Sequence, residues 1–213
     1  VVDRLVFGSM YQCGQSCISL QRLYIHSSLY QEVAAKLVAA VKVLKLGDPF
    51  DESTFVGPMI SEQEAIRVES WVNEAVSKGA LILCGGKRQG ALYGPTVIEN
   101  VLPGCKLATE EVFGPVVCLY KFEDFKTVIS EVNLSQYGLQ TGLFTKDVDK
   151  AFYAFNNLET GCVVLNDVPS VRVDSQPYGG VKDSGFGREG LRSAIEEMTE
   201  VRVLLLKDVG RVE

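Results

Sequence analysis

Residues 115–145, "PVVCLYKFEDFKTVISEVNLSQYGLQTGLFT", decide the fold class of this 213-residue chain. Residues 115–122 and 138–145 are rich in apolar and β-branched side chains, as strands are, and residues 124–133 between them have helical spacing. A strand, a helix and a second strand in this order predict a parallel sheet. Because the strands are apolar along much of their length, we expect helices on both faces of the sheet.

The same alternation extends in both directions from this stretch. Two long helices are predicted by capping boxes, one formed by Ser28 and Gln31 and the other by Ser61 and Glu64. Further helices are expected over residues 147–158 and 191–198, a short buried strand over residues 81–86, and further strands over residues 161–166 and 201–206. The sequence therefore predicts an α/β fold, a three-layer α/β/α sandwich with a mostly parallel sheet.

The composition excludes several classes of partner. The net charge is −6 and the pI is near 5.0, whereas nucleic acids and anionic membranes are bound by basic faces. No apolar run is long enough to span a membrane. Six cysteines scattered through a chain of this size are not typical of a disulfide framework. We therefore expect a reducing, cytoplasmic location. The chain opens on "VVDRLVFGS" in the middle of a pattern, so we expect a processed or excised piece of a longer protein.

The stretch "YQCGQSCISLQR", residues 11–22, holds the first candidate site. Cys13 and Cys17 are spaced C-x3-C with no second pair, and His26 is the only histidine, so no metal site is expected. Cys17 follows a tight Gly-Gln turn, where its thiol could attack a carbonyl while its backbone N–H stabilises the oxyanion. The alternative is a buried cysteine that packs against the edge of a strand.

A nucleophilic cysteine needs a base, and the sequence offers none nearby. His26 lies nine residues after Cys17 in what is expected to be the same strand. An odd separation in a strand places the two side chains on opposite faces, which excludes a Cys–His pair. The base must then be a carboxylate or a group outside this chain.

Two further patterns suggest nucleotide binding. In "TEEVFGPVV", residues 109–117, a glutamate could hold a ribose diol while Phe113 supports a flat ring; the alternative is a solvated acidic turn. Residues 185–190, "GFGREG", match the dinucleotide fingerprint G-x-G-x-x-G. However, "GGVKDS" before them is typical of a loop, and the fingerprint requires a strand at that position.

Taken together and in order, the motifs resemble the aldehyde dehydrogenase superfamily. They are "GQSC" (14–17), "LGDPFD" (46–51), "GPMIS" (57–61), "GPTVI" (94–98), "EEVFGPV" (110–116), "PYGGVKDSGFGREG" (177–190) and "MTEVR" (198–202). The resemblance is to the C-terminal catalytic domain, over residues 1–184, followed by a tail over residues 185–213 that packs on the cofactor and oligomerisation region. The chain looks most similar to the branch of lactaldehyde, phosphonoacetaldehyde and non-phosphorylating glyceraldehyde-3-phosphate dehydrogenases.

The resemblance implies a chemistry and a set of residues. Cys17 would attack an aldehyde to give a thiohemiacetal, lose a hydride to NAD or NADP, and leave a thioester that water hydrolyses. The resemblance also implies cofactor contacts by Glu111 and Phe113, a structural role for Arg22, and substrate contacts by Ser16, Ile18, Arg172 and Tyr178. In this family "GFGREG" belongs to the loop at the substrate mouth and cradles no phosphate.

The nature of the substrate depends on Arg172. A guanidinium at this position would suit a small aldehyde with a distal hydroxyl or anionic group. The alternative is a structural ion pair with Asp174.

The resemblance also implies parts that lie upstream of Val1. These are the cofactor domain, an oxyanion-hole asparagine and the glutamate that acts as the base. We therefore expect this chain alone to be inactive and its parent to be a homo-oligomer. The competing functions are a dehydrogenase that transfers the acyl group to coenzyme A and a non-catalytic assembly domain.

Overall fold

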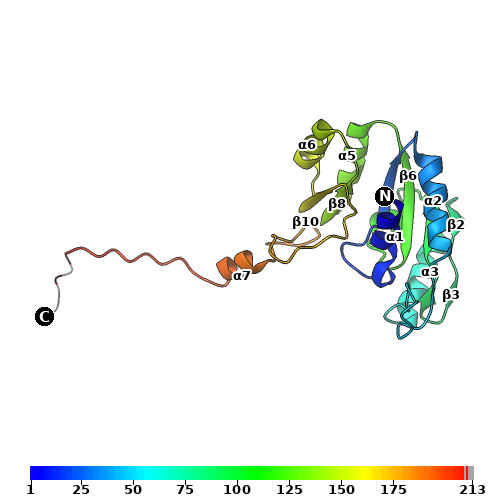
Figure 1. Ribbon diagram of the computed structural model, residues 1–213, viewed down its shortest axis with the longest axis horizontal. Helices are drawn as coiled ribbons and strands as arrows, with labels where there is room; N and C mark the ends of the chain where they lie inside the picture. The colour runs from blue at the N-terminus through cyan, green and yellow to red at the C-terminus, as the bar shows by residue number, and fades with distance from the viewer. Residues whose placement is uncertain (209, 211–213) are drawn as a thin grey trace.

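The computed structural model describes residues 1–208 and 210. Figure 1 shows a body that contains α1, α2, α3 and β6, with a second group of elements, α5, α6, β8 and β10, beside it. The chain leaves this second group through α7 and a tail that projects far from the body. No helix in the described part of the chain is long and apolar enough to cross a membrane.

The main sheet has four strands in the order β1-β6-β5-β2, where β1 is Arg22–His26, β6 Val116–Phe122, β5 Thr96–Glu99 and β2 Leu81–Cys84. β6 runs parallel to both neighbours, and β2 is antiparallel to β5. A second parallel pair joins β8 (Gln140–Leu143) to β9 (Cys162–Leu165). Two short antiparallel pairs complete the strands: β3 (Arg88–Gln89) with β4 (Leu92–Tyr93), and β7 (Tyr137–Gly138) with β10 (Val181–Lys182). The predicted α/β fold with a mostly parallel sheet is confirmed.

Helices cover both faces of the main sheet. The helical segments are α1 (Val2–Met10), a 3-10 turn η1 (Tyr11–Gly14), α2 (Tyr30–Lys42), α3 (Glu62–Ser77), α4 (Lys106–Thr109), α5 (Phe125–Asn133), α6 (Val148–Asn157) and α7 (Leu191–Glu197). Of these, α5 and α6 lie in the second group of elements and α7 leads into the tail (Figure 1). Tyr30 of α2 donates a hydrogen bond to Glu99, which shares one face of the sheet with Leu119. The thiol of Cys118, on the opposite face, lies 3.9 Å from the Leu107 carbonyl of α4. Four consecutive buried residues at the start of β6 agree with cover on both faces.

Two apolar cores hold the chain together. The larger core packs α1, α2 and α3 with the main sheet. The smaller core contains Ile129 of α5 with Ala154 and Leu158 of α6 and its end, and it lies in the second group of elements. The predicted helix after β6 is confirmed as α5, whose first turn is capped by the Asp124 carboxylate accepting from the Thr127 N–H at 2.8 Å.

Three local predictions need correction. Ser28 does not cap α2; the N-cap is Leu29, and the Ser28 hydroxyl instead contacts the His26 ring at 2.8 Å. Residues 81–84 do form a strand, but Leu81 and Ile82 are exposed because β2 is an edge strand. Residues 201–206 form no strand. An extended segment becomes a strand only when its backbone pairs with a neighbour, and this segment is exposed in the projecting tail.

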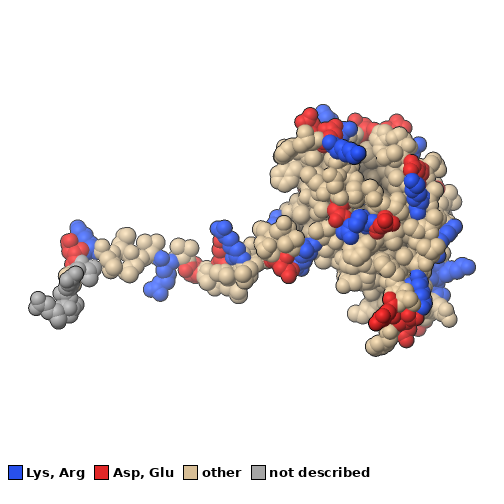
Figure 2. Space-filling model, in the orientation of Figure 1, with Lys and Arg blue, Asp and Glu red and all other residues tan. Residues whose placement is uncertain are grey.

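Figure 2 shows acidic and basic side chains interspersed over the visible face of the body, without a large area of one sign. The tail in the same view is mostly uncharged and carries isolated charges. Its apolar residues, Val201 and 203–206, are among the most exposed in the protein.

Candidate active site

A strained turn places Cys17 against a distant loop. After α1 the backbone passes through Gln12, Cys13 and Gly14 with φ of 50°, 58° and 66°, all left-handed. A Cβ on Gly14 would lie 2.1 Å from the carbonyl oxygen of Gly114, so only glycine fits at this approach. The turn with the candidate nucleophile and the loop with Glu111 and Phe113 are therefore in direct backbone contact.

The Cys17 thiol meets a tyrosine on its other side. Cys17 is exposed, and its Sγ lies 2.9 Å from the hydroxyl oxygen of Tyr178. Desolvation and the contact with Cys17 raise the pKa of the Tyr178 phenol well above its usual range. The Arg172 guanidinium lies 4.4 Å from the centre of the Tyr178 ring and pairs with Glu189 at 2.9 Å. The Tyr178 side chain therefore lies in contact with both the Cys17 thiol, through its hydroxyl, and the Arg172 guanidinium, through its ring.

A cavity of about 540 Å³ is lined in part by Cys17 but not by Tyr178. Its wall includes Ser16, Cys17, Glu111 and Phe113, and the cavity continues between β1 and β8. The Phe113 backbone is left-handed, with φ of 47°, and its side chain is 41% exposed. Cys17 thus borders a cavity lined by a carboxylate and an aromatic ring, and its thiol also contacts the Tyr178–Arg172 pair.

Glu110 and Glu111, adjacent in the sequence, differ in their surroundings. The Glu110 carboxylate lies near Gln136 and Tyr137, at 3.4 and 3.5 Å. Within residues 1–208, no hydrogen bond engages the Glu111 carboxylate. Partial desolvation raises the pKa of Glu111, and the nearby positive charge of Arg67 opposes this shift. Glu111 is therefore a carboxylate free to accept hydrogen bonds from a ligand such as a ribose diol.

Ser16 and Ile18, the neighbours of Cys17, are used differently. The Ser16 hydroxyl accepts a hydrogen bond from Tyr11 and borders the cavity. Ile18 does not line the cavity; its carbonyl accepts from the Ser170 hydroxyl at 2.7 Å. This bond ties the turn of the nucleophile to the segment just before Arg172. The backbone N–H of Cys17 has no acceptor among the described residues.

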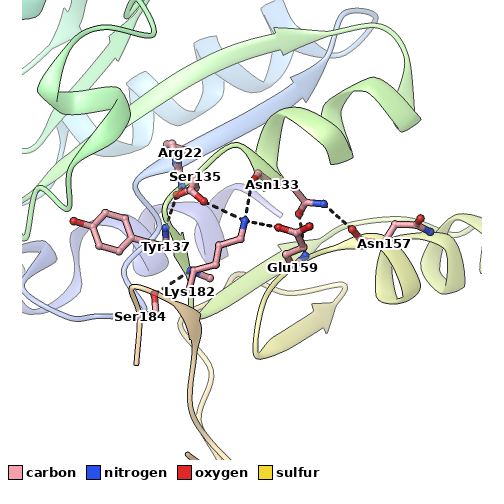
Figure 3. Close-up of polar contacts among 9 residues, drawn as sticks. Arg22, Asn133, Ser135, Tyr137, Asn157, Glu159, Lys182 and Ser184 are labelled. Atoms are coloured by element: carbon pink, nitrogen blue, oxygen red, sulfur yellow. Dashed lines mark hydrogen bonds and ion pairs between the residues drawn. The ribbon is translucent and has the colours of Figure 1, made fainter. Parts of the chain in front are cut away.

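The segment that carries Tyr178 is anchored by Lys182, as Figure 3 shows. The Lys182 ammonium donates to the carbonyls of Asn133 and Ser135, at 2.6 and 3.1 Å, and pairs with Glu159 at 2.6 Å. Arg22 at the start of β1 donates to the Ser135 hydroxyl at 2.8 Å. These contacts connect the strand that follows Cys17 to the lobe that supports Tyr178.

Residues 185–190 pack on the same segment. Tyr178 and Glu189 exchange two backbone hydrogen bonds, with N···O distances of 3.0 and 2.6 Å. Gly185, Gly187 and Gly190 all have positive φ, and the strand before the loop, β10, is two residues long and antiparallel to β7. The fingerprint instead follows a parallel strand of a βαβ unit, so this geometry does not match it.

Two predictions need correction: the shared strand of Cys17 and His26, and the ion-pair partner of Arg172. Cys17 lies in a turn and β1 begins only at Arg22, so the argument from strand alternation does not apply to His26. His26 nevertheless faces elsewhere, with its ring against Phe122 and Ser28. Arg172 pairs with Glu189 rather than with Asp174, because the loop after Tyr178 folds back on it. No local signal links residues 172 and 189.

Residues 1–208 and 210 contain no cluster of three or more His, Cys, Asp or Glu suited to a metal ion.

The cysteines should differ strongly in alkylation. Burial raises the pKa of Cys13 and of Cys118 to about 12, so only about one thiol in ten thousand is ionised at pH 8. Cys17 is exposed. At pH 8 iodoacetamide should label Cys17 at least about a hundredfold faster than Cys13 or Cys118. Peptide mapping over time measures this, and the chain unfolded in guanidinium is the control. Equal labelling of Cys13 and Cys17 in the folded chain would contradict the geometry.

Replacement of Gly14 by alanine should destabilise the protein. The left-handed φ and the contact with the Gly114 carbonyl both oppose a Cβ. We expect a loss of about 3 kcal/mol in the free energy of unfolding. The midpoint of urea unfolding measures the loss, and Gly90→Ala is the matched control, with similar φ and open space around its Cα. Equal midpoints for the two variants would show that the contact with Gly114 is unimportant.

Comparisons with known proteins place the chain in a family. Residues 1–204 match the aldehyde dehydrogenase family. The 3-sulfolactaldehyde dehydrogenase of Priestia aryabhattai is 50% identical over 198 residues, which are 93% of this chain and 42% of that protein.

Solved structures agree. Aldehyde dehydrogenase 21 from Physcomitrella patens, in complex with the reaction product succinate, superposes with a TM-score of 0.96 and 56% identity over 99% of this chain and 44% of that one. The glyceraldehyde-3-phosphate dehydrogenase GapN of Methanocaldococcus jannaschii, complexed with NADP, superposes with a TM-score of 0.90 and 40% identity over 93% and 43% of the two chains. The chain thus spans less than half the length of these relatives. The match over residues 1–204 and the agreement of the fold with these structures show that the chain belongs to the aldehyde dehydrogenase family.

Proposed function

We propose that this chain carries the nucleophile of an NAD(P)-dependent aldehyde dehydrogenase that oxidises an aldehyde to a carboxylic acid. The observation that carries this proposal is the place of Cys17. Its exposed thiol stands between a cavity bordered by Glu111 and Phe113 and the Tyr178–Arg172 pair. A cofactor on the first side and an aldehyde on the second would both reach the sulfur.

The reaction would begin with attack of the Cys17 thiolate on the aldehyde carbon, which gives a thiohemiacetal. The free backbone N–H of Cys17 is available to donate to the oxyanion that forms. The phenol of Tyr178, whose raised pKa keeps it protonated, would donate to the thiolate and stabilise it before attack.

The residues on the cavity side fit a nicotinamide nucleotide. The free carboxylate of Glu111 would accept hydrogen bonds from the two ribose hydroxyls, and the exposed ring of Phe113 would support the nicotinamide. A bound NAD(P)+ would supply the acceptor for the hydride that leaves the thiohemiacetal carbon. A thioester then remains on Cys17, and addition of water yields the acid and restores the thiol.

A base for the first step and for hydrolysis is expected outside these residues. Within the described part of the chain, the hydrogen-bonding partner of the Cys17 thiol is Tyr178, which cannot accept a proton while it is itself protonated. We therefore propose that the 213 residues alone do not turn over aldehyde, and that the segments present in the longer relatives supply the base and most of the cofactor contacts.

We propose that the substrate is a small aldehyde with a distal anionic group. Arg172 lies over the Tyr178 ring and could form paired hydrogen bonds to a carboxylate. The succinate in the Physcomitrella relative and the sulfonated aldehyde in the name of the Priestia relative support this choice. Succinate semialdehyde is thus the first candidate.

The test of this function uses an enzyme of full family length that contains this sequence. With succinate semialdehyde and NAD(P)+ it should form NAD(P)H and succinate in equal amounts, whether or not coenzyme A is present. Formation of succinyl-coenzyme A would support the acylating alternative. Absence of NAD(P)H with anionic and neutral aldehydes alike would instead support a non-catalytic assembly domain.

We also propose that the full-length protein is a cytoplasmic homo-oligomer. The exposed apolar segment in residues 201–206 supports an association of copies, because a long apolar segment in water is unfavourable.

A further inference from the structure

The side chain of Gln21 binds the loop that carries Glu111. Its Nε2 donates to the carbonyls of Leu107 and Glu110, at 3.1 and 2.7 Å. Its Oε1 accepts from the backbone N–H of Val112 at 2.9 Å. One half-buried amide therefore satisfies three backbone groups of a segment about 90 residues away in the sequence.

These bonds bracket Glu111. The Glu110 carbonyl and the Val112 N–H belong to the peptide groups on either side of it, so the Gln21 amide contacts the loop much as a neighbouring strand would. The Glu111 carboxylate makes no hydrogen bond within residues 1–208, so the position of this residue depends on its backbone. Arg67 assists by donating to the Val112 carbonyl at 2.7 Å.

Gln21 also belongs to the segment of the nucleophile. It lies four residues after Cys17 and immediately before β1. The backbone carbonyl of Gln21 accepts a hydrogen bond from the Cys118 N–H of β6 at 2.8 Å. Through its side chain and its backbone, Gln21 therefore fixes the distance between the segment that follows Cys17 and the loop of Glu111. It holds the loop of Glu111 and Phe113 on the segment that presents the thiol.

We propose that Gln21 is a positioning residue for the cofactor side of the site. The inference rests on the proposed function, since it assumes that Glu111 and Phe113 contact NAD(P)+. Loss of the amide would displace Glu111 and weaken cofactor binding, while the aldehyde side, held by other contacts, would keep its geometry.

Gln140 of β8 provides the reciprocal variant. Its Nε2 donates to the carbonyls of Pro169 and Val171, which lie just before Arg172. Gln140 is also a half-buried glutamine that bonds backbone carbonyls, but the segment it holds leads to the aldehyde side. A general effect of losing a buried glutamine would be the same in both variants, whereas a positioning effect would not.

The experiment compares Gln21→Met, Gln21→Glu and Gln140→Met in the full-length enzyme. Gln21→Met should raise the KM for NAD(P)+ about tenfold or more and change the KM for the aldehyde less than about twofold. Gln140→Met should show the opposite result, with a raised KM for the aldehyde and a nearly unchanged KM for NAD(P)+. Gln21→Glu keeps the acceptor for the Val112 N–H but not the two donors, so its KM for NAD(P)+ should also rise.

Amide exchange in the same proteins gives a readout that does not require turnover. The Val112 amide should exchange faster in Gln21→Met than in wild type or in Gln140→Met. Equal changes in both KM values, or a lower melting temperature with unchanged kinetics, would overturn the positioning role. If the wild-type enzyme forms no NAD(P)H, the proposed function fails. In that case, an unchanged exchange rate of the Val112 amide in Gln21→Met would separately refute the proposal that Gln21 holds the loop of Glu111.

Discussion

Replacement of Cys17 by serine is expected to lower kcat/KM for aldehyde oxidation by about four orders of magnitude or more in the full-length enzyme. A serine hydroxyl is almost entirely protonated at neutral pH, and the hydroxyl that Cys17 contacts in the described structure, that of Tyr178, has a raised pKa and cannot remove its proton. Formation of NAD(P)H at saturating cofactor measures the loss.

The matched control is Cys162→Ser. Cys162 lies half-buried in β9, away from the cavity wall, and its variant should keep kcat/KM within about twofold of wild type. If Cys17→Ser retained more than about one hundredth of the wild-type activity while it remained folded, Cys17 could not be the nucleophile.

Arg172→Ala should change the choice of substrate. We expect kcat/KM for succinate semialdehyde to fall about a hundredfold, while that for a neutral aldehyde of similar length changes less than about threefold. The loss has two causes. The cation that would bind the distal carboxylate is removed, and Glu189, which Arg172 neutralises at 2.9 Å, is left to repel an anionic substrate. Initial rates with both aldehydes give the ratio.

Glu189→Gln separates the two causes. If Arg172 binds the substrate, the loss of its competing partner should leave kcat/KM for the semialdehyde equal to that of wild type or raise it by up to about threefold. An unchanged ratio of anionic to neutral kcat/KM in Arg172→Ala would mean that the guanidinium only forms the structural pair with Glu189.

Local signals predicted most of the elements. The apolar run of β6 and the periodicity of α5 gave the correct order of strand and helix, and Ser61 caps α3 by accepting from the Glu64 N–H, as the capping box predicts. The same box at Ser28 was misleading because the neighbouring His26 ring takes up its hydroxyl. Residues 201–206 have the composition of a strand, but a strand also needs a partner, which composition does not reveal.

In the candidate site, too, the residues could be predicted from the sequence but their contacts could not. Cys17, Glu111, Tyr178 and Arg172 could be named from ordered motifs, because the resemblance supplied what no single motif carries. Their contacts could not be predicted. The Cys17–Tyr178 hydrogen bond joins residues 161 apart in the sequence, and the bonds of Gln21 to Leu107, Glu110 and Val112 span 86–91 residues. Such contacts depend on the closed fold and leave no periodic trace in the sequence.

The central claim is that Cys17 becomes acylated when the aldehyde is oxidised. Full-length enzyme mixed with succinate semialdehyde and NAD(P)+ can be quenched in acid within milliseconds, digested and examined by mass spectrometry. The account predicts one succinyl group on the peptide that contains Cys17, present only when aldehyde and cofactor are both added. A burst of NAD(P)H without acylated Cys17, or with the acyl group on another residue, would contradict it.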